Sequence, residues 1–118
     1  MGRKLVIRQP GEEFESELLG FDAKIVCRAI TVADMERIMT KFGKPGALAD
    51  SIRTCVVRIE STDLDEKGKP SSSIDGRDVD GIAASGLLSV VARHIAVEYL
   101  MVGLVEGIQI VDEATLGN

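Results

Sequence analysis

The carboxylates of residues 62–73, which read TDLDEKGKPSSS, are the side chains best placed by spacing to do chemistry. Three residues match the first, third and sixth positions of an EF-hand calcium loop: Asp63, Asp65 and Gly68. That loop also needs oxygen ligands at its fifth and twelfth positions, where this chain has Lys67 and Ile74. A cation repels the metal and a branched alkyl group cannot coordinate it. We therefore expect a polar turn, ended by Pro70, and no calcium site.

The remaining ionisable residues do not form a catalytic pattern. His94 is the only histidine, and Glu98 lies one helical turn away, so the two can form a local hydrogen bond. No serine or cysteine nucleophile stands at a diagnostic spacing from them. Further carboxylates lie in a glycine-containing stretch in which nothing fixes a ligand shell: Asp75, Asp78 and Asp80. Because there is also no GxGxxG or Walker A motif, we expect no catalytic residue, no metal ligand and no cofactor.

Composition limits the class of protein. The chain has 118 residues, which is an ordinary size for one domain. Hydrophobic residues make up 45% but aromatic residues only 3%, with no tryptophan, so the core must be aliphatic, and we expect it to be built mainly from helices. The formal net charge is -5, and no basic patch is accompanied by aromatic residues, which argues against nucleic acid as the partner.

Cysteine use and hydropathy favour a cytoplasmic protein. Cys27 and Cys55 each lie in an apolar run without metal-ligand spacing, so we expect two free, buried thiols and no disulfide. The apolar run near the N-terminus has three residues, too few for a signal peptide. The longest apolar stretch, residues 81–105, is interrupted by an arginine, a histidine and a glutamate, which are costly inside a bilayer. We expect no membrane span.

The N-terminal half is expected to contain strands followed by one helix. Residues 1–20 include KLVIRQ, which is either a short strand or part of an extended arm. Residues 23–30 alternate in the manner of a half-buried strand, with Ile25 and Cys27 on one face. Thr31, with an aspartate three residues later, predicts a helix start. Four residues at helical spacing predict its apolar face: Met35, Ile38, Met39 and Phe42.

The C-terminal half is expected to be helical on either side of a long loop. Residues 48–59 place Leu48, Ile52 and Cys55 on one helical face, although the segment CVVRIE has enough β-branched residues to be a strand instead. Residues 61–81 are predicted to be an acidic, glycine-rich loop. Residues 87–105 form the third predicted helix, which is apolar almost all round and is therefore central or packed in an oligomer.

Together these elements predict one α+β domain over residues 1–118 that is mostly helical. Short N-terminal strands, or a hairpin, are expected to be followed by about three to four helices. A terminal helix too apolar for one small domain to cover predicts a homo-oligomer.

The order of these segments resembles the tail assembly chaperones of long-tailed bacteriophages. The resemblance covers about residues 20–105: a strand AKIVCRAI, a helix TVADMERIMTKFG of the T-x-x-[DE] type, and a Val/Ile segment leading into a D-x-D-x-x-G-x-P turn before a terminal apolar helix. The chain departs from the family in having RIEST where Trp-Gly often precedes the turn. The arm over residues 1–20 has no counterpart in the pattern.

This resemblance implies a non-enzymatic protein that binds the tape measure protein during tail assembly, with the tail tube protein as a further partner. It implies that seven residues divide between core and partner contact: Met35, Ile38, Met39, Phe42, Leu87, Val91 and Ile95. The flexible side chain of Met101 suits the same adaptable apolar recognition. Two alternatives stay open. One is a virion component such as a tail or baseplate subunit, and the other is a small cytoplasmic regulatory or enzymatic domain with an unrecognised site.

Overall fold

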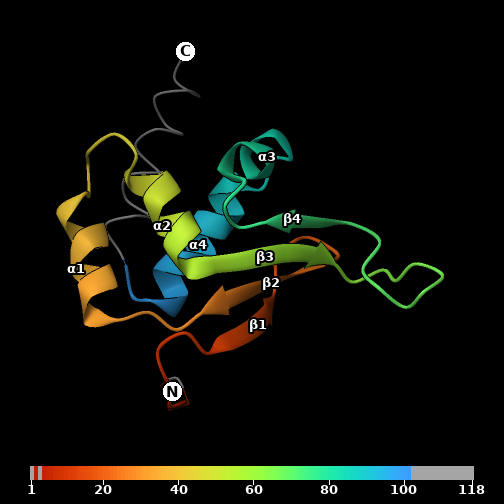
Figure 1. Ribbon diagram of the computed structural model, residues 1–118, viewed down its shortest axis with the longest axis horizontal. Coiled ribbons are helices and arrows are strands. Elements are labelled where there is room, and N and C mark those ends of the chain that lie inside the picture. Colours follow the sequence, from red (N-terminus) through yellow and green to blue (C-terminus); the bar gives the residue numbers. More distant parts are fainter. Residues whose placement is uncertain (1, 3, 102–118) are drawn as a thin grey trace.

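A four-stranded antiparallel sheet and four helices form the fold in the computed structural model, which describes residues 2 and 4–101 (Figure 1). The elements follow in the order β1 (Glu13–Glu17), β2 (Ala23–Arg28), α1 (Val32–Thr40), α2 (Ala47–Cys55), β3 (Val56–Ser61), β4 (Ser73–Asp75), α3 (Val79–Ala84) and α4 (Leu88–Glu98). Each strand pairs with the next in sequence, so β1 and β4 are the two edges of the sheet.

The fold is α+β, but the prediction of a mostly helical chain in which helices follow the strands is wrong. Helices take up 35% and strands 22% of the described part of the chain. Two strands, β3 and β4, lie in sequence between α2 and α3. The aliphatic composition misled the prediction because the valines and isoleucines that fill a helical core also favour strands.

The start of α1 is as predicted. Thr31 accepts a hydrogen bond from the backbone N–H of Asp34 at 3.1 Å, and the Asp34 carboxylate accepts one from the backbone N–H of Thr31 at 3.3 Å. This reciprocal capping box satisfies two N–H groups that a helix start otherwise leaves without partners. Arg37 bonds to the same carboxylate at 3.0 Å, and these contacts hold the pKa of Asp34 below its usual value.

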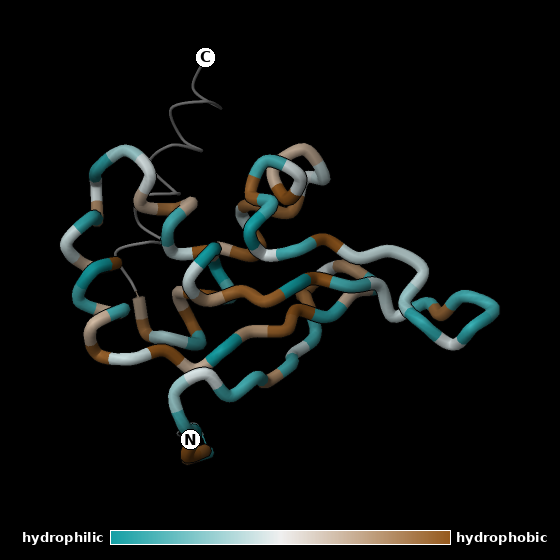
Figure 2. Tube along the Cα trace, viewed as in Figure 1, coloured by the Kyte–Doolittle hydropathy of each residue, from teal (hydrophilic) through white to brown (hydrophobic). Residues whose placement is uncertain are grey.

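One face of the sheet carries the hydrophobic core. Ile25 and Cys27 of β2 and Ile59 of β3 point to this face, where they meet residues from all four helices. The helical members of this core are Ile38, Ile52, Cys55, Ile82, Val91 and Ile95. Figure 2 shows the same division, with hydrophobic positions along the central strands and a hydrophilic loop beyond β3. The strand predicted over residues 23–30 is therefore confirmed as β2, although Val26 is buried as well.

The other face of the sheet is charged. Lys24 lies 3.4 Å from both Glu15 of β1 and Glu60 of β3. Arg58 lies 3.1 Å from Glu60 and 3.8 Å from Glu13. These contacts link neighbouring strands. Glu60 is largely buried, whereas the pairs at Glu13 and Glu15 are exposed and each stabilise a fold by only about 0–1 kcal/mol. The face is therefore suited to water more than to a packed partner.

The helix predicted over residues 48–59 ends four residues early. Helix α2 ends at Cys55, and Val56 is already extended, with φ -98° and ψ 127°. The chain passes directly into β3, which pairs with β2 on one side and β4 on the other. Three of the six residues CVVRIE are β-branched, and from Val56 onward the strand alternative is the correct one.

The helix predicted over residues 87–105 also ends early. Helix α4 stops at Glu98, and the N–H of Met101 bonds to the carbonyl of Ala96 at 2.8 Å across Leu100, which has φ 58°. This is the Schellman arrangement that ends many helices, here without the usual glycine. Met101 is turned into the core by it. Residues 102–105 of the prediction lie outside the described residues.

The two predicted irregular regions both contain regular structure. Strand β1 lies in the expected arm over residues 1–20, and the described residues before Gln9 form no strand pairing. The expected loop over residues 61–81 contains β4 and the start of α3. The sequence did not predict either element, because a three-residue strand and a six-residue helix are too short to show a hydrophobic period.

Candidate functional site

The seven residues expected to lie partly in the core and partly at a partner surface differ in their burial. Four have side chains in the core: Ile38, Leu87, Val91 and Ile95. Met35 and Phe42 are half-buried and pack against the core. Met39 is 56% exposed, so it is the one member of the set whose side chain lies mainly on the surface. Met101 is also in the core.

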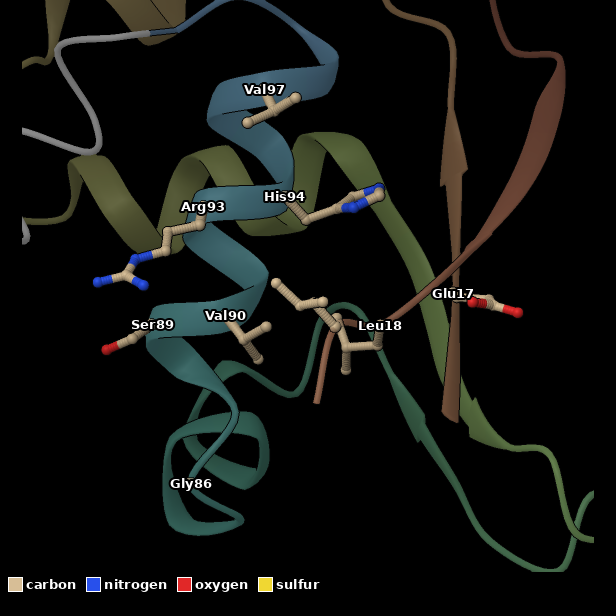
Figure 3. Close-up of a pocket in the computed structure, with 9 residues that line it drawn as sticks. Glu17, Leu18, Gly86, Ser89, Val90, Arg93, His94 and Val97 are labelled. Atoms are coloured by element: carbon tan, nitrogen blue, oxygen red, sulfur yellow. The ribbon is translucent and has the colours of Figure 1, made fainter. Parts of the chain in front are cut away.

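An apolar groove lies between α4 and the end of β1 (Figure 3). Its volume is about 470 Å³. Its apolar lining is formed by Leu18, Leu19, Val90 and Val97. Polar residues also line it: Glu17, Ser89, Arg93 and His94. Leu19 is 86% and Val97 is 60% exposed, so the groove is open to solvent along an apolar wall.

Residues at both ends of α4 lie near β1, and the groove lies between them and the strand. At one end Leu18, directly after β1, and Val90 on the first turn of α4 line the same cavity. At the other end the rings of Phe14 and Tyr99 are 6.2 Å apart. The Tyr99 hydroxyl donates to the Arg28 carbonyl at 2.5 Å, which fixes the end of α4 against β2. The groove itself lies at the end of β1, where Glu17, Leu18 and Leu19 line it.

His94 is the polar group most deeply set in the groove. Figure 3 shows its ring reaching from α4 toward the strands, whereas Ser89 and Arg93 point to the opposite side of the helix. The Nε2 atom of His94 is buried and has no hydrogen-bond partner among the described residues. Burial lowers the pKa of His94, and the negative charge of Glu98 opposes this in part. The ring is accordingly neutral near pH 7.

This environment predicts a pH-dependent stability. Because the pKa of His94 is lower in the folded than in the unfolded chain, its neutral form favours folding above the unfolded pKa of about 6.5, and that contribution is lost as the pH falls through the folded pKa. We expect the melting temperature to fall between pH 7.5 and pH 5, and to fall less for His94→Gln. Equal falls in both proteins would show that other groups cause the effect; Asp34 and Asp75 have lowered pKa values and respond in more acidic solution.

The acidic loop is held by its own hydrogen bonds. The Asp65 carboxylate accepts bonds from the N–H groups of Lys67 and Lys69 at 2.8 and 3.0 Å, and Gly68 takes φ 78° at the tip. The predicted turn is confirmed. Asp75 pairs with Arg77, and Asp78 caps α3 by accepting from the N–H of Gly81. In the described residues no three histidine, cysteine, aspartate or glutamate side chains come together as a metal site would require.

The two cysteines are free and buried, as predicted. Cys27 on β2 and Cys55 at the end of α2 lie in the core, and burial raises the pKa of each thiol to about 12. Such thiols are protonated near pH 7 and make poor nucleophiles. The same burial raises the pKa of Tyr99, whose hydroxyl contacts the Cys55 carbonyl at 3.4 Å.

Apart from His94, the sequence did not single out the residues that line the groove. Leu18 and Leu19 fall in a segment with no clear period, and Val90 and Val97 looked like two more apolar positions of an all-apolar helix. The only local signal was the pair of consecutive leucines at the end of an acidic stretch. Which of them is exposed depends on how α4 packs against β1.

Comparison with known proteins gives no match to a family model, a curated protein or a solved structure. In the described part of the chain, the helices are too short and too polar to cross a bilayer.

Proposed function

We propose that the protein is a non-enzymatic binding protein that takes an apolar segment of a partner protein into the groove between α4 and β1. The observation that supports this most is the open apolar wall of the groove, in which Leu19 and Val97 are largely exposed. Exposed apolar surface that forms a concave, polar-rimmed site is typical of sites that bind another molecule.

The partner we propose is the tape measure protein of a long-tailed bacteriophage, in the cytoplasm of the host cell. This choice rests on the resemblance of segment order, and the groove is compatible with it. An amphipathic or apolar helix presents anchors at i, i+3, i+4 and i+7, which suits a groove lined along one helix. On α1, Val32 and Met39 add a second exposed apolar surface, at 75% and 56% exposure. Flexible methionine side chains adapt to irregular apolar partners.

The test is co-expression with the tape measure protein of the same genome, followed by recovery of the complex from low to high salt. We expect recovery to be nearly independent of salt, because apolar burial is not screened whereas exposed charge pairs are screened over about 10 Å at 0.1 M ionic strength. Val97→Asp should reduce recovery about tenfold or more by placing a charge in the apolar wall.

Leu64→Asp is the matched control. Leu64 is an aliphatic side chain of similar exposure, 65% against 60% for Val97, but it lies in the loop beyond β3, away from the groove. Failure of the unmodified chain to form any complex would rule out the chaperone function. If the complex dissociates at high salt, or if both aspartate variants weaken it equally, the identity of the partner stands. Either result would contradict the groove as the binding site.

A further inference from the structure

The segment before β1 is an unusual feature of the surface. Residues 4–8 read KLVIR, and three consecutive apolar side chains in it face solvent: Leu5 is 83%, Val6 54% and Ile7 79% exposed. We call residues 4–8 the arm. The arm has the β-branched composition of a strand, yet no strand pairing is formed by it in the described chain. Figure 2 shows hydrophobic positions close to the N mark.

Strand β1 presents an unpaired edge of matching length. The N–H of Leu18 bonds to the carbonyl of Ala23, and the N–H of Ala29 bonds to the carbonyl of Glu12. Since backbone bonds alternate along an antiparallel pair, even-numbered residues of β1 bond to β2 and odd-numbered ones face outward. The outward backbone groups are those of Glu13, Glu15 and Glu17. A strand of five residues fits this edge of five.

We propose that the arm of a second copy of this chain pairs with β1 as an antiparallel fifth strand, and that two copies exchange arms reciprocally. The register that fits places Lys4 opposite Glu17 and Arg8 opposite Glu13. Lysine and arginine then lie beside the glutamates of the charged face, and opposite charges paired across strands stabilise a sheet. The inference does not depend on the identity of the proposed tape measure partner.

The same register covers two exposed apolar residues of the arm. In a strand, successive side chains point to opposite faces, so Leu5 and Ile7 point away from the glutamates. They come to lie beside Ser16 and Phe14, on the face where α4 covers the sheet. The groove begins beyond them, at Glu17. The exchange thus covers Leu5 and Ile7 of the arm and leaves the groove open to a partner.

Two alternative occupants of the edge are less suitable. Direct pairing of β1 with β1 of a second copy would set six glutamates on one face, and like charges on paired strands are unfavourable. The arm of the same chain is directed away by the turn at Pro10 and Gly11, in which the N–H of Glu12 bonds to the Gln9 carbonyl at 3.0 Å and Gly11 has φ 86°. This is the type II geometry, which splays the strands of a two-residue hairpin.

One contact within the single copy has to be replaced. The Arg8 guanidinium lies 3.8 Å from the centre of its own Phe14 ring. In the exchanged dimer Ile7 of the second copy covers that ring, and Arg8 moves to the glutamates of the other chain. An isologous exchange forms both such sites at once, which closes the assembly as a dimer.

Sedimentation of the full chain over a range of concentrations tests the exchange. We expect a dimer for the unmodified chain and for Leu64→Asp. The double variant Leu5→Asp, Ile7→Asp should weaken the dimer about a hundredfold or more, because two charges are then placed on the core side of the sheet, one of them beside the Phe14 ring. Lys4→Glu should weaken it about tenfold, and Glu17→Lys in the same chain should restore it. A chain that is monomeric throughout, or a dimer that survives the double variant, would overturn the proposal.

A cross-linking experiment checks the register and the identity of the occupant. Chains with Leu5→Cys are mixed with chains with Ser16→Cys and oxidised, and Val6→Cys replaces Leu5→Cys as the control because it points to the other face. We expect a cross-linked pair from Leu5→Cys only. In a further variant, one chain carries both Leu5→Cys and Ser16→Cys. An intramolecular disulfide in a monomer of this variant would show that the chain's own arm pairs with the edge of β1. The double aspartate variant keeps every groove residue, so its capture of the tape measure protein tests the proposed function separately.

Discussion

Replacing Ile95 by alanine is expected to lower the free energy of unfolding by about 2–5 kcal/mol. The Ile95 side chain is fully buried in the cluster that joins α4 to the sheet. Its truncation removes apolar contacts and leaves a cavity that the surrounding core fills only in part. A small domain has about 5–15 kcal/mol of stability in all, so the loss is a large share of it. Chemical denaturation followed by circular dichroism measures it.

Val97→Ala is the matched control on the same helix. Val97 is 60% exposed, two residues further along α4, and lines the groove. We expect its truncation to change the free energy of unfolding by no more than about 0.5 kcal/mol, as for ordinary surface positions. Comparable losses at both positions would mean that the surface of α4 is covered in the native protein, and would contradict the division between core and groove.

Replacing Gly76 by alanine is expected to destabilise the fold by about 3 kcal/mol. Gly76 follows β4, and its N–H bonds to the Val57 carbonyl at 3.0 Å. A Cβ atom at this position would lie far inside contact distance of the Val56 carbonyl oxygen. Because that atom is backbone at the start of β3, it cannot move aside as a side-chain end can. The strand pair β3 and β4 must therefore separate or distort.

Gly68→Ala is the comparison for this effect. Gly68 has a φ of 78°, but a Cβ atom there would meet nothing within 4 Å. The cost is then only that of the left-handed backbone conformation, about 1–2 kcal/mol, without a clash. In thermal unfolding at one pH, the melting temperature of Gly76→Ala should be lower than that of Gly68→Ala. The opposite order would show that β4 is not held tightly against β3.

Local sequence was enough where neighbours in the chain decide the structure. The capping box at Thr31 and Asp34 is formed by residues three apart, so its signature is complete in the sequence. The turn around Asp65 and Gly68 is equally local. Strand β2 followed from apolar alternation, and the buried thiols followed from the apolar runs around each cysteine.

Sequence was not enough where the choice depends on distant partners. Residues 56–59 suit a helix or a strand, and only pairing with β2 and β4 made them β3. Strand β4 has three residues, and its stability comes from its neighbour and not from its own composition. Helix α4 ends at Glu98 because Leu100 adopts a left-handed conformation. The glycine that usually predicts such a helix end is not present at that position.

The sequence by itself determined an acidic, aliphatic domain with a capped helix, a polar turn and two thiols kept from solvent, because these depend on residue type and short spacing. The tertiary structure alone decided which apolar residues are surface. Burial is a property of the whole packing: one turn of α4 places Ile95 in the core and Val97 in the groove, and the antiparallel course of α4 along β1 brings Leu18 and Val90 together from opposite ends of the chain.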